Sequence, residues 1–282
     1  LAQFDNPEAI LLRGGKNVDY PITQRIIGGK KIGESRLKLQ VGDVLVLITD
    51  GVTHAGLGKC LPMGWDRKEV IEYIEECYTP DLSAKGLAAQ VAAACRDLYV
   101  QEFDDDTTIL VLKVRERRVV NLLIGPPQKW EDDEKVCRLF FAREGEKIVC
   151  GGSTATMVAD YLKKPLLMDD DYVESDVPPT ARIEGVDLVT EGVVTMSRVV
   201  ELARQFCATD LVEYKWGRDG ASRIAEILFE KATDINFFVG MAVNPSHQNP
   251  DLKIDFTIKM TLVKELEECL KKMGKNVKMS TF

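Results

Sequence analysis

The stretch Val41–Gly56, VGDVLVLITDGVTHAG, decides how the first part of this chain folds. Its apolar run 44–48 is short and bounded by a Gly-Asp turn, which predicts a strand buried on both faces. The run leads into Asp50, and Gly51 follows without a Cβ, so another backbone or a ligand can approach. A carboxylate at a rigid strand tip suits a hard divalent cation such as Mg²⁺ or Mn²⁺. The alternative is an ordinary Asp-Gly turn.

A second acidic motif favours the metal interpretation. Three adjacent acids, Asp104 to Asp106, precede the run 107–114, whose β-branched residues predict another strand. Adjacent carboxylates repel one another unless solvent or a cation relieves the repulsion. Helical patterns at 69–77 and 83–99, the second with Ser83 as its expected N-cap, separate the two motifs. We therefore expect an α+β layered unit whose acidic strand tips meet at one sheet edge and hold two metals.

The first 114 residues resemble a known family. The pattern L-x-x-G-D-V-L-V-L-I-T-D-G-V-T-H-A, then helices, then D-D-x-T and an apolar strand, is similar to the C-terminal half of the metal-dependent protein phosphatases (PPM, protein phosphatase 2C-like) of bacterial SpoIIE type. The resemblance implies Asp50 and Asp105 as metal ligands, beside Gly51, with Mn²⁺ or Mg²⁺ as the cofactor. Asp104 is the alternative to Asp105 if the second motif starts one residue earlier.

The resemblance also implies a function. It predicts a metal-dependent serine/threonine phosphoprotein phosphatase whose partner is a phosphorylated protein substrate. The family's other Asp-Gly pair lies in its N-terminal half, which would precede Leu1, so we expect an incomplete two-metal site and weak or no activity in this chain alone. The alternative is a non-catalytic regulatory or scaffold protein that uses a phosphatase-like fold to bind a partner.

The charged segment 115–118 predicts a domain boundary. Residues 1–116 would then form the C-terminal part of a PPM-type β-sandwich with helices. In residues 117–282 strand and helix patterns alternate, which indicates a Rossmann-like α/β domain with a parallel sheet. We expect this second domain to be regulatory or ligand-binding, and the fold class of the whole chain to be α/β with an α+β first domain.

A glycine pair marks the best candidate site of the second domain. A predicted strand ends at Cys150 and is followed by Gly151, Gly152, Ser153 and Thr154. Backbone amides at a helix N-terminus attract anions, so we predict that these four residues bind a small anionic ligand. The alternative is a tight turn in which Ser153 or Thr154 is an ordinary N-cap.

Composition limits the partners and the compartment. A formal net charge of −8 disfavours nucleic acid and anionic membranes as partners. Seven scattered cysteines without a C-x-x-C pair, and only two histidines, disfavour a structural zinc site and predict a reducing, cytoplasmic location. The sequence contains no run of about 18 apolar residues, so no membrane span is predicted. The last helical pattern, 256–273, is expected to pack into the core, with binding in a partner's groove as the alternative. A homodimer or larger complex is a separate candidate for the assembly of the chain.

Overall fold

The computed structural model of the chain describes residues 1–103, 105–169, 177–208, 216–242 and 254–282. The chain forms two compact units, of which the first contains Leu1–Glu116 and the second contains the described residues from Arg117 onward. Both units combine helices with sheets, which confirms the α/β class predicted from the sequence.

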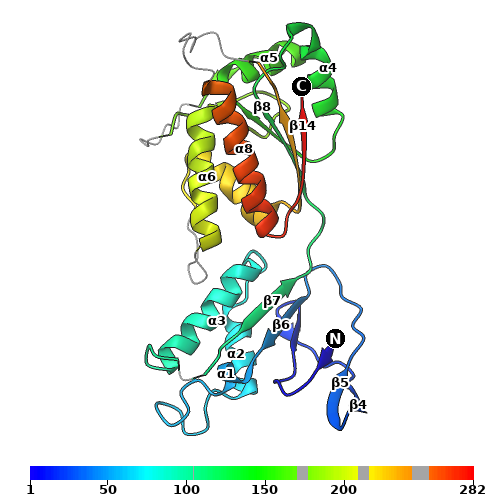
Figure 1. The fold of residues 1–282 in the computed structure, drawn as a ribbon, viewed down its shortest axis with the longest axis vertical. Helices are drawn as coiled ribbons and strands as arrows, with labels where there is room; N and C mark the ends of the chain where they lie inside the picture. Colours follow the sequence, from blue (N-terminus) through cyan, green and yellow to red (C-terminus); the bar gives the residue numbers. More distant parts are fainter. Residues whose placement is uncertain (104, 170–176, 209–215, 243–253) are drawn as a thin grey trace. The chain divides into compact units, whose positions relative to one another are not determined.

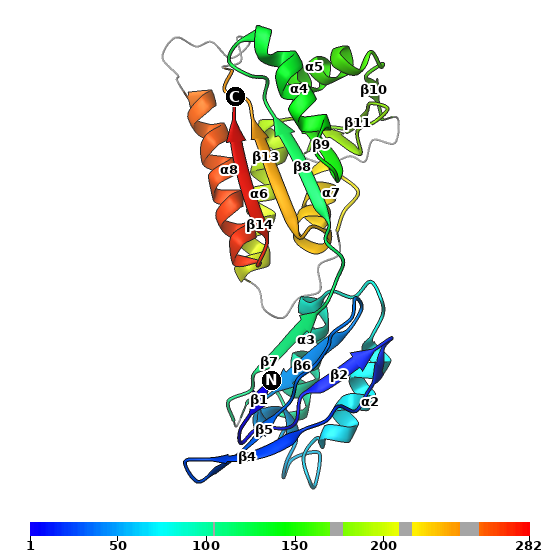
Figure 2. The ribbon, with the colours of Figure 1, turned by 90° about the vertical axis from the view of Figure 1, so that its right-hand side faces the viewer.

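A four-stranded antiparallel sheet forms the centre of the first unit (Figures 1 and 2). Its order is β3-β2-β6-β7, and its strands are β2 (Ile10–Arg13), β3 (Lys16–Asn17), β6 (Val44–Ile48) and β7 (Ile109–Lys113). The apolar run predicted as a strand is β6, and its last residue, Ile48, lies opposite the first residue of β7, Ile109. This register brings the two acidic motifs to one edge of the sheet.

Two helices, α2 (Arg67–Cys77) and α3 (Ala84–Leu98), cover one face of this sheet. Their apolar side chains share one buried core with alternate residues of β2 and β6. Each helix starts at a side-chain cap, because the N–H groups of a first turn lack partners within the helix. Ser83 caps α3, as predicted, by accepting a hydrogen bond from the Gly86 N–H at 3.0 Å, and Asp66 caps α2.

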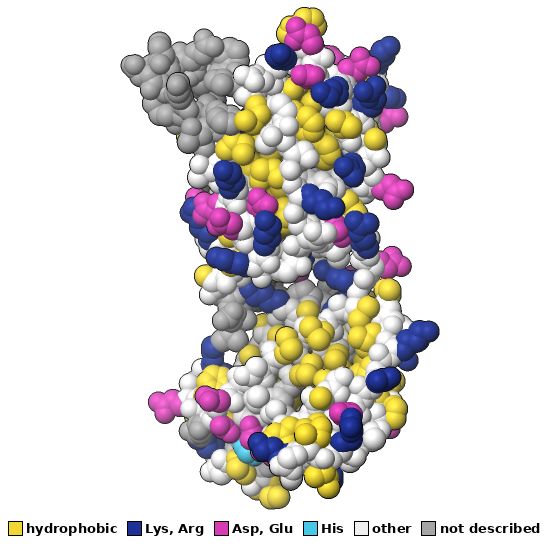
Figure 3. All heavy atoms as spheres, turned by 45° about the vertical axis from the view of Figure 1, so that its right-hand side comes forward, with side chains coloured by type: hydrophobic (Ala, Val, Ile, Leu, Met, Phe, Trp, Pro, Cys, Tyr) yellow, Lys and Arg dark blue, Asp and Glu magenta, His cyan; other side chains and the backbone are white. Residues whose placement is uncertain are grey.

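The opposite face of the sheet carries a stripe of leucines. Leu45 of β6 lies opposite Leu112 of β7, and Leu47 lies opposite Leu110. Leu110 and Leu112 are 49% and 47% exposed. Figure 3 shows hydrophobic side chains gathered on the visible face of this unit. Exposed apolar side chains such as Leu110 and Leu112 are typical of a binding surface or of one that promotes aggregation when they gather on one face.

A three-stranded antiparallel sheet completes the first unit. Its order is β1-β5-β4, with β1 (Ala2–Gln3), β4 (Thr23–Ile27) and β5 (Lys30–Glu34). The Gly14-Gly15 turn returns the chain into β3, whereas β4 pairs with β5 across a second turn at Gly28-Gly29. All four glycines have positive φ, as such hairpin turns require.

A seven-stranded sheet forms the centre of the second unit, in the order β10-β11-β12-β9-β8-β13-β14. The strands are β8 (Val119–Ile124), β9 (Glu146–Cys150), β10 (Leu167–Met168), β11 (Ala181–Arg182), β12 (Leu188–Thr190), β13 (Asp234–Val239) and β14 (Asn276–Thr281). The five strands from β12 to β14 are parallel, and β10 and β11 pair antiparallel. Across the sheet, the five parallel strands are the third, second, first, fourth and fifth of them in the sequence. This order is a doubly wound arrangement. The parallel sheet expected from the alternating pattern is therefore present.

Helices lie on both faces of this sheet (Figures 1 and 2). The first face carries α4 (Asp133–Phe141), preceded by a short 3-10 turn (Trp130–Asp132), and α5 (Gly152–Leu162); the second carries α6 (Val193–Ala208), α7 (Gly220–Ala225) with the π-helical turn that continues it (Glu226–Lys231), and α8 (Ile254–Lys272). Leu266 and Leu270 of α8 are fully buried, so the predicted core packing of the last helix is confirmed. No helix among the described residues combines the length and the apolar character that crossing a bilayer requires.

Candidate metal centre

Thr49 joins the two acidic motifs just beyond the end of β6. Its N–H donates to the Thr108 carbonyl at 3.1 Å, and its hydroxyl donates to the Asp106 carbonyl at 3.0 Å. The same hydroxyl oxygen accepts from the Thr108 N–H at 2.9 Å. These bonds extend the contact between the two strands past their last paired residues. The next residue, Asp50, starts the short helix α1 (Asp50–Thr53). Its backbone is therefore fixed by the Thr49 bonds on one side and by the helical turn on the other.

Gly51 allows the second motif to lie against the first. It is buried, and a Cβ at this position would lie 2.6 Å from the Asp106 carbonyl oxygen and 2.8 Å from Thr107 Oγ1. Both distances are shorter than real Cβ contacts, so a larger residue would push the two motifs apart. The Gly51 carbonyl accepts a hydrogen bond from the Tyr99 hydroxyl at 2.7 Å. The glycine after Asp50 therefore has a packing role in this structure.

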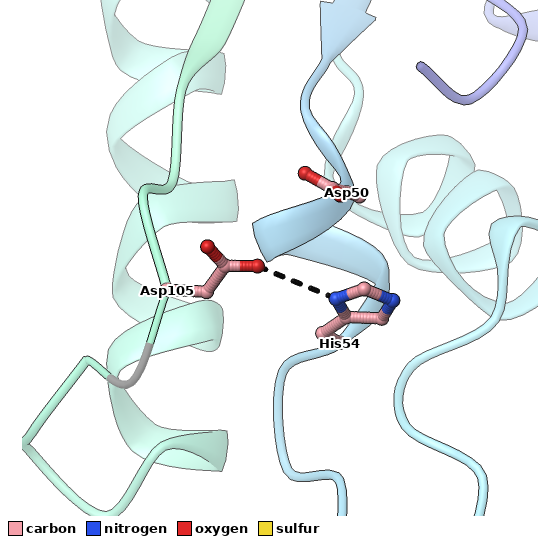
Figure 4. Close-up of side chains that lie close together, drawn as sticks. All are labelled: Asp50, His54 and Asp105. Atoms are coloured by element: carbon pink, nitrogen blue, oxygen red, sulfur yellow. Dashed lines mark hydrogen bonds and ion pairs between the residues drawn. The ribbon is translucent and has the colours of Figure 1, made fainter. Parts of the chain in front are cut away.

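Three side chains converge where the motifs meet. Asp50, His54 and Asp105 can each offer one ligand atom, and these atoms all lie within 4.8 Å of one another. His54 Nδ1 lies 3.4 Å from Asp105 Oδ2 (Figure 4). The other oxygen of Asp105 accepts from the Asp106 N–H at 2.8 Å, which orients the carboxylate. All three residues are exposed, so water and a substrate can reach them.

The chemistry of these side chains fits a divalent cation. Two carboxylates this close repel each other, and a cation between them removes the repulsion. Carboxylate oxygens suit Mg²⁺ and Mn²⁺, and imidazole nitrogen suits the transition metals. The cluster is therefore a candidate site for one such ion, with open positions on its solvent side.

The predicted ligands are partly brought together. Asp50 and Asp105 lie in one cluster, Gly51 lies buried behind Asp50, and Asp104 lies outside the described residues. Metal binding at each of these positions stays a prediction. His54 was not predicted as a ligand, because the small number of histidines disfavoured metal sites that depend on imidazole. The available signal was its spacing of four from Asp50, which puts both side chains on one face of a helical turn.

The four residues predicted to bind an anion in the second unit do not all face solvent. Gly151 is the N-cap of α5, with φ +111° and no side-chain capping bond. Gly152 and Ser153 are exposed, but Thr154 is buried and its Oγ1 accepts from the Gly125 N–H at 2.9 Å. The alternative that Ser153 or Thr154 is the N-cap is wrong, because α5 already begins at Gly152. Anion binding at these four residues stays a prediction.

Comparison with known proteins gives a family for the first unit. Residues 1–115 match the model of the family described as Stage II sporulation protein E (SpoIIE). This match lies within the first unit and supports the resemblance to SpoIIE-type phosphatases that its motifs indicated. No curated protein matches the chain.

Two solved structures are similar to part of the chain. One is the phosphatase domain of the cell fate determinant SpoIIE from Bacillus subtilis, with 17% identity and a TM-score of 0.31, covering 38% of this chain and 48% of that one. The other is the same domain presoaked with Mn, with 14% identity and a TM-score of 0.34, covering 41% of this chain and 50% of that one. This chain spans about half the length of those domains.

Proposed function

We propose that the first unit is the part of a metal-dependent serine/threonine phosphoprotein phosphatase that holds Mn²⁺ or Mg²⁺ through Asp50 and Asp105. The observation that carries the proposal is the convergence of both motifs at one sheet edge, with ligand atoms within 4.8 Å of one another. The match of residues 1–115 to the SpoIIE family supports the reaction class. The activity of a whole phosphatase is part of the proposal, because the chain spans about half of the similar domains.

Each residue of the site would have a separate role in binding the cation or in positioning its ligands. Asp50 and Asp105 bind the cation, and the Asp106 N–H keeps the Asp105 carboxylate in position. The hydroxyl of Thr49 holds the two motifs in register. A divalent cation bound there supplies charge that stabilises a transferring phosphoryl group and lowers the pKa of a water nucleophile. The exposed side of the cluster leaves room for a phosphorylated side chain.

A non-catalytic role is the second candidate. Over the described ranges, the metal-binding candidates form one cluster with two carboxylates, whereas two-metal phosphatase sites hold a second ion about 3.5–4 Å from the first. In that case the phosphatase-like unit binds a partner without turnover. In either case we propose that the second, doubly wound unit is regulatory.

The test compares activity and metal binding. With Mn²⁺ present, this chain should release phosphate from a phosphoserine peptide only weakly, because its two-metal site is expected to be incomplete, and Asp50→Asn or Asp105→Asn should abolish both this turnover and Mn²⁺ binding measured by calorimetry. Asp106→Asn is the matched control, because Asp106 contacts Thr49 and Asp105 through its backbone groups. Turnover that persists in EDTA and in both variants would exclude a metal-dependent phosphatase. Metal binding without turnover would favour the non-catalytic role.

A further inference from the structure

His54 is fixed relative to Asp50 by the backbone. It is the C-cap residue of α1, with right-handed helical angles of φ −85° and ψ −5°. Its N–H donates to the Asp50 carbonyl at 2.8 Å, which closes one full helical turn between the two residues. Their side chains therefore leave the same face of the turn.

The spacing between His54 and Asp105 suits two ligands of one ion. Donors about 2.1 Å from a metal lie about 3.0 Å apart at a right angle and about 3.4 Å apart at the tetrahedral angle. His54 Nδ1 and Asp105 Oδ2 are 3.4 Å apart, which is longer than an ordinary hydrogen bond to a carboxylate. Asp50, His54 and Asp105 can each offer one ligand atom so that all three atoms lie within 4.8 Å of one another.

A purely structural role would gain little from this pair. The side chains of His54 and Asp105 are 50% and 45% exposed. Ion pairs between such exposed groups contribute about 0–1 kcal/mol. A role in holding Asp105 is thus the weaker explanation for an imidazole that lies beside Asp105 on the helical turn that also carries Asp50.

We propose that His54 is a third metal ligand and that it makes the site prefer transition metals over Mg²⁺. The proposal rests on the proposed function, since it concerns the same cation. Mg²⁺ takes oxygen ligands almost exclusively, whereas Mn²⁺, Co²⁺ and Zn²⁺ accept imidazole nitrogen with rising affinity from Mn²⁺ to Co²⁺. A site of two carboxylates alone would show a smaller preference.

The experiment measures metal binding to the 282-residue chain without reference to turnover. Titrations with Mg²⁺, Mn²⁺ and Co²⁺ compare the unchanged chain with His54→Ala. Cys60→Ser is the control for a soft donor, because Cys60 carries an exposed thiol. Since the chain has only two histidines, the ring resonances of His54 can be assigned by NMR from the His54→Ala variant. Mn²⁺ should broaden the His54 signals before those of His247.

We expect His54→Ala to weaken Co²⁺ binding by at least about tenfold and Mg²⁺ binding much less, since even indirect partners of metal ligands change affinity by about 10- to 100-fold. Equal losses for Co²⁺ and Mg²⁺, or unbroadened His54 signals with Asp50-dependent binding intact, would overturn the role of His54 and leave the proposed function standing. No binding that depends on Asp50 or Asp105 would overturn both.

Discussion

At Gly51 a single hydrogen atom in place of a methyl group lets two segments of chain touch. Gly51→Ala puts a Cβ 2.6 Å from the Asp106 carbonyl oxygen, so the segment that carries Asp105 has to move. We expect unfolding free energy to fall by about 1–3 kcal/mol, as in other overpacked sites. Mn²⁺ affinity should fall with it. Urea denaturation and calorimetry measure the two effects, and unchanged values for both would contradict this close contact.

Two neighbouring glycines in the second unit should respond differently to the same change. Gly151 has φ +111°, a conformation that side-chain-bearing residues rarely adopt, and Gly151→Ala should cost about 1–2 kcal/mol. Gly152 starts α5, and a Cβ added there would meet no other atom within 4 Å, so Gly152→Ala should be neutral or stabilise by up to about 1 kcal/mol. Thermal unfolding of the two variants provides the comparison. Equal destabilisation would mean that the turn has another conformation.

Among the elements, β13 depends on one carboxylate at its start. Asp234 accepts hydrogen bonds from Arg117 at 3.1 Å, from Asn276 at 2.9 Å and from Thr233 at 2.8 Å. Asn276 starts β14 and Arg117 precedes β8, so one side chain connects the beginnings of three adjacent strands. The Arg117 guanidinium, and after it the other two donors, lower the pKa of Asp234 to about 2.

This pKa predicts a pH dependence of stability. The folded carboxylate binds a proton less readily than the unfolded one, whose pKa is about 3.9, so its stabilisation is complete above that value and is lost as pH falls through about 2. Asp234→Asn should lower the unfolding free energy at pH 7 by up to about 2 kcal/mol and flatten its decrease between about pH 4 and pH 2. Urea denaturation across this range tests it. Arg117→Gln should reproduce most of the effect, and independent effects of the two changes would contradict the pair.

A helix or strand can be predicted from sequence where the residues that define it lie within the element itself. The strand at Val44–Ile48 and the capped start of α3 at Ser83 were predictable, because an apolar run and a capping residue are local features. β14 was missed, because Asn276–Thr281 contains only Val277 and Met279 as apolar residues and is defined by its pairing with β13. The meeting of Asp50 with Asp105 was expected from strand order, but the Thr49 bonds that fix it join residues far apart in sequence.

On the scale of the whole molecule, the core clusters of described residues each lie within one unit. The two clusters of the first unit contain residues up to Val111, and the cluster around α4 and α5 contains residues from Leu123 onward. We therefore expect residues 117–282 to fold when produced alone, with one cooperative thermal transition within a few degrees of the corresponding transition in the full chain. Calorimetry of both proteins tests this. A non-cooperative or absent transition would show that the second unit needs the first.

The exposed leucines Leu110 and Leu112 predict that copies of the chain associate at high concentration. Leu110 and Leu112 contribute apolar surface without being buried in either core of the first unit. The double change Leu110→Ser and Leu112→Ser should reduce concentration-dependent association and change stability by less than about 1 kcal/mol. Light scattering against concentration measures the association. The buried neighbour change Val46→Ser is the matched control and should unfold the unit.

The order of strands in the second unit also determines when it can fold during synthesis. β13 lies between β8 and β14, and Asn236 bonds to Asn121, 115 residues earlier in the chain. On the ribosome, β8 and β9 are synthesised long before β13. The edge of β8 that pairs with β13 therefore stays unpaired while more than a hundred codons are translated. Contacts of such long range form slowly and leave strand edges open to other nascent chains. Chaperones that cover exposed edges should therefore matter more for the second unit than for the first.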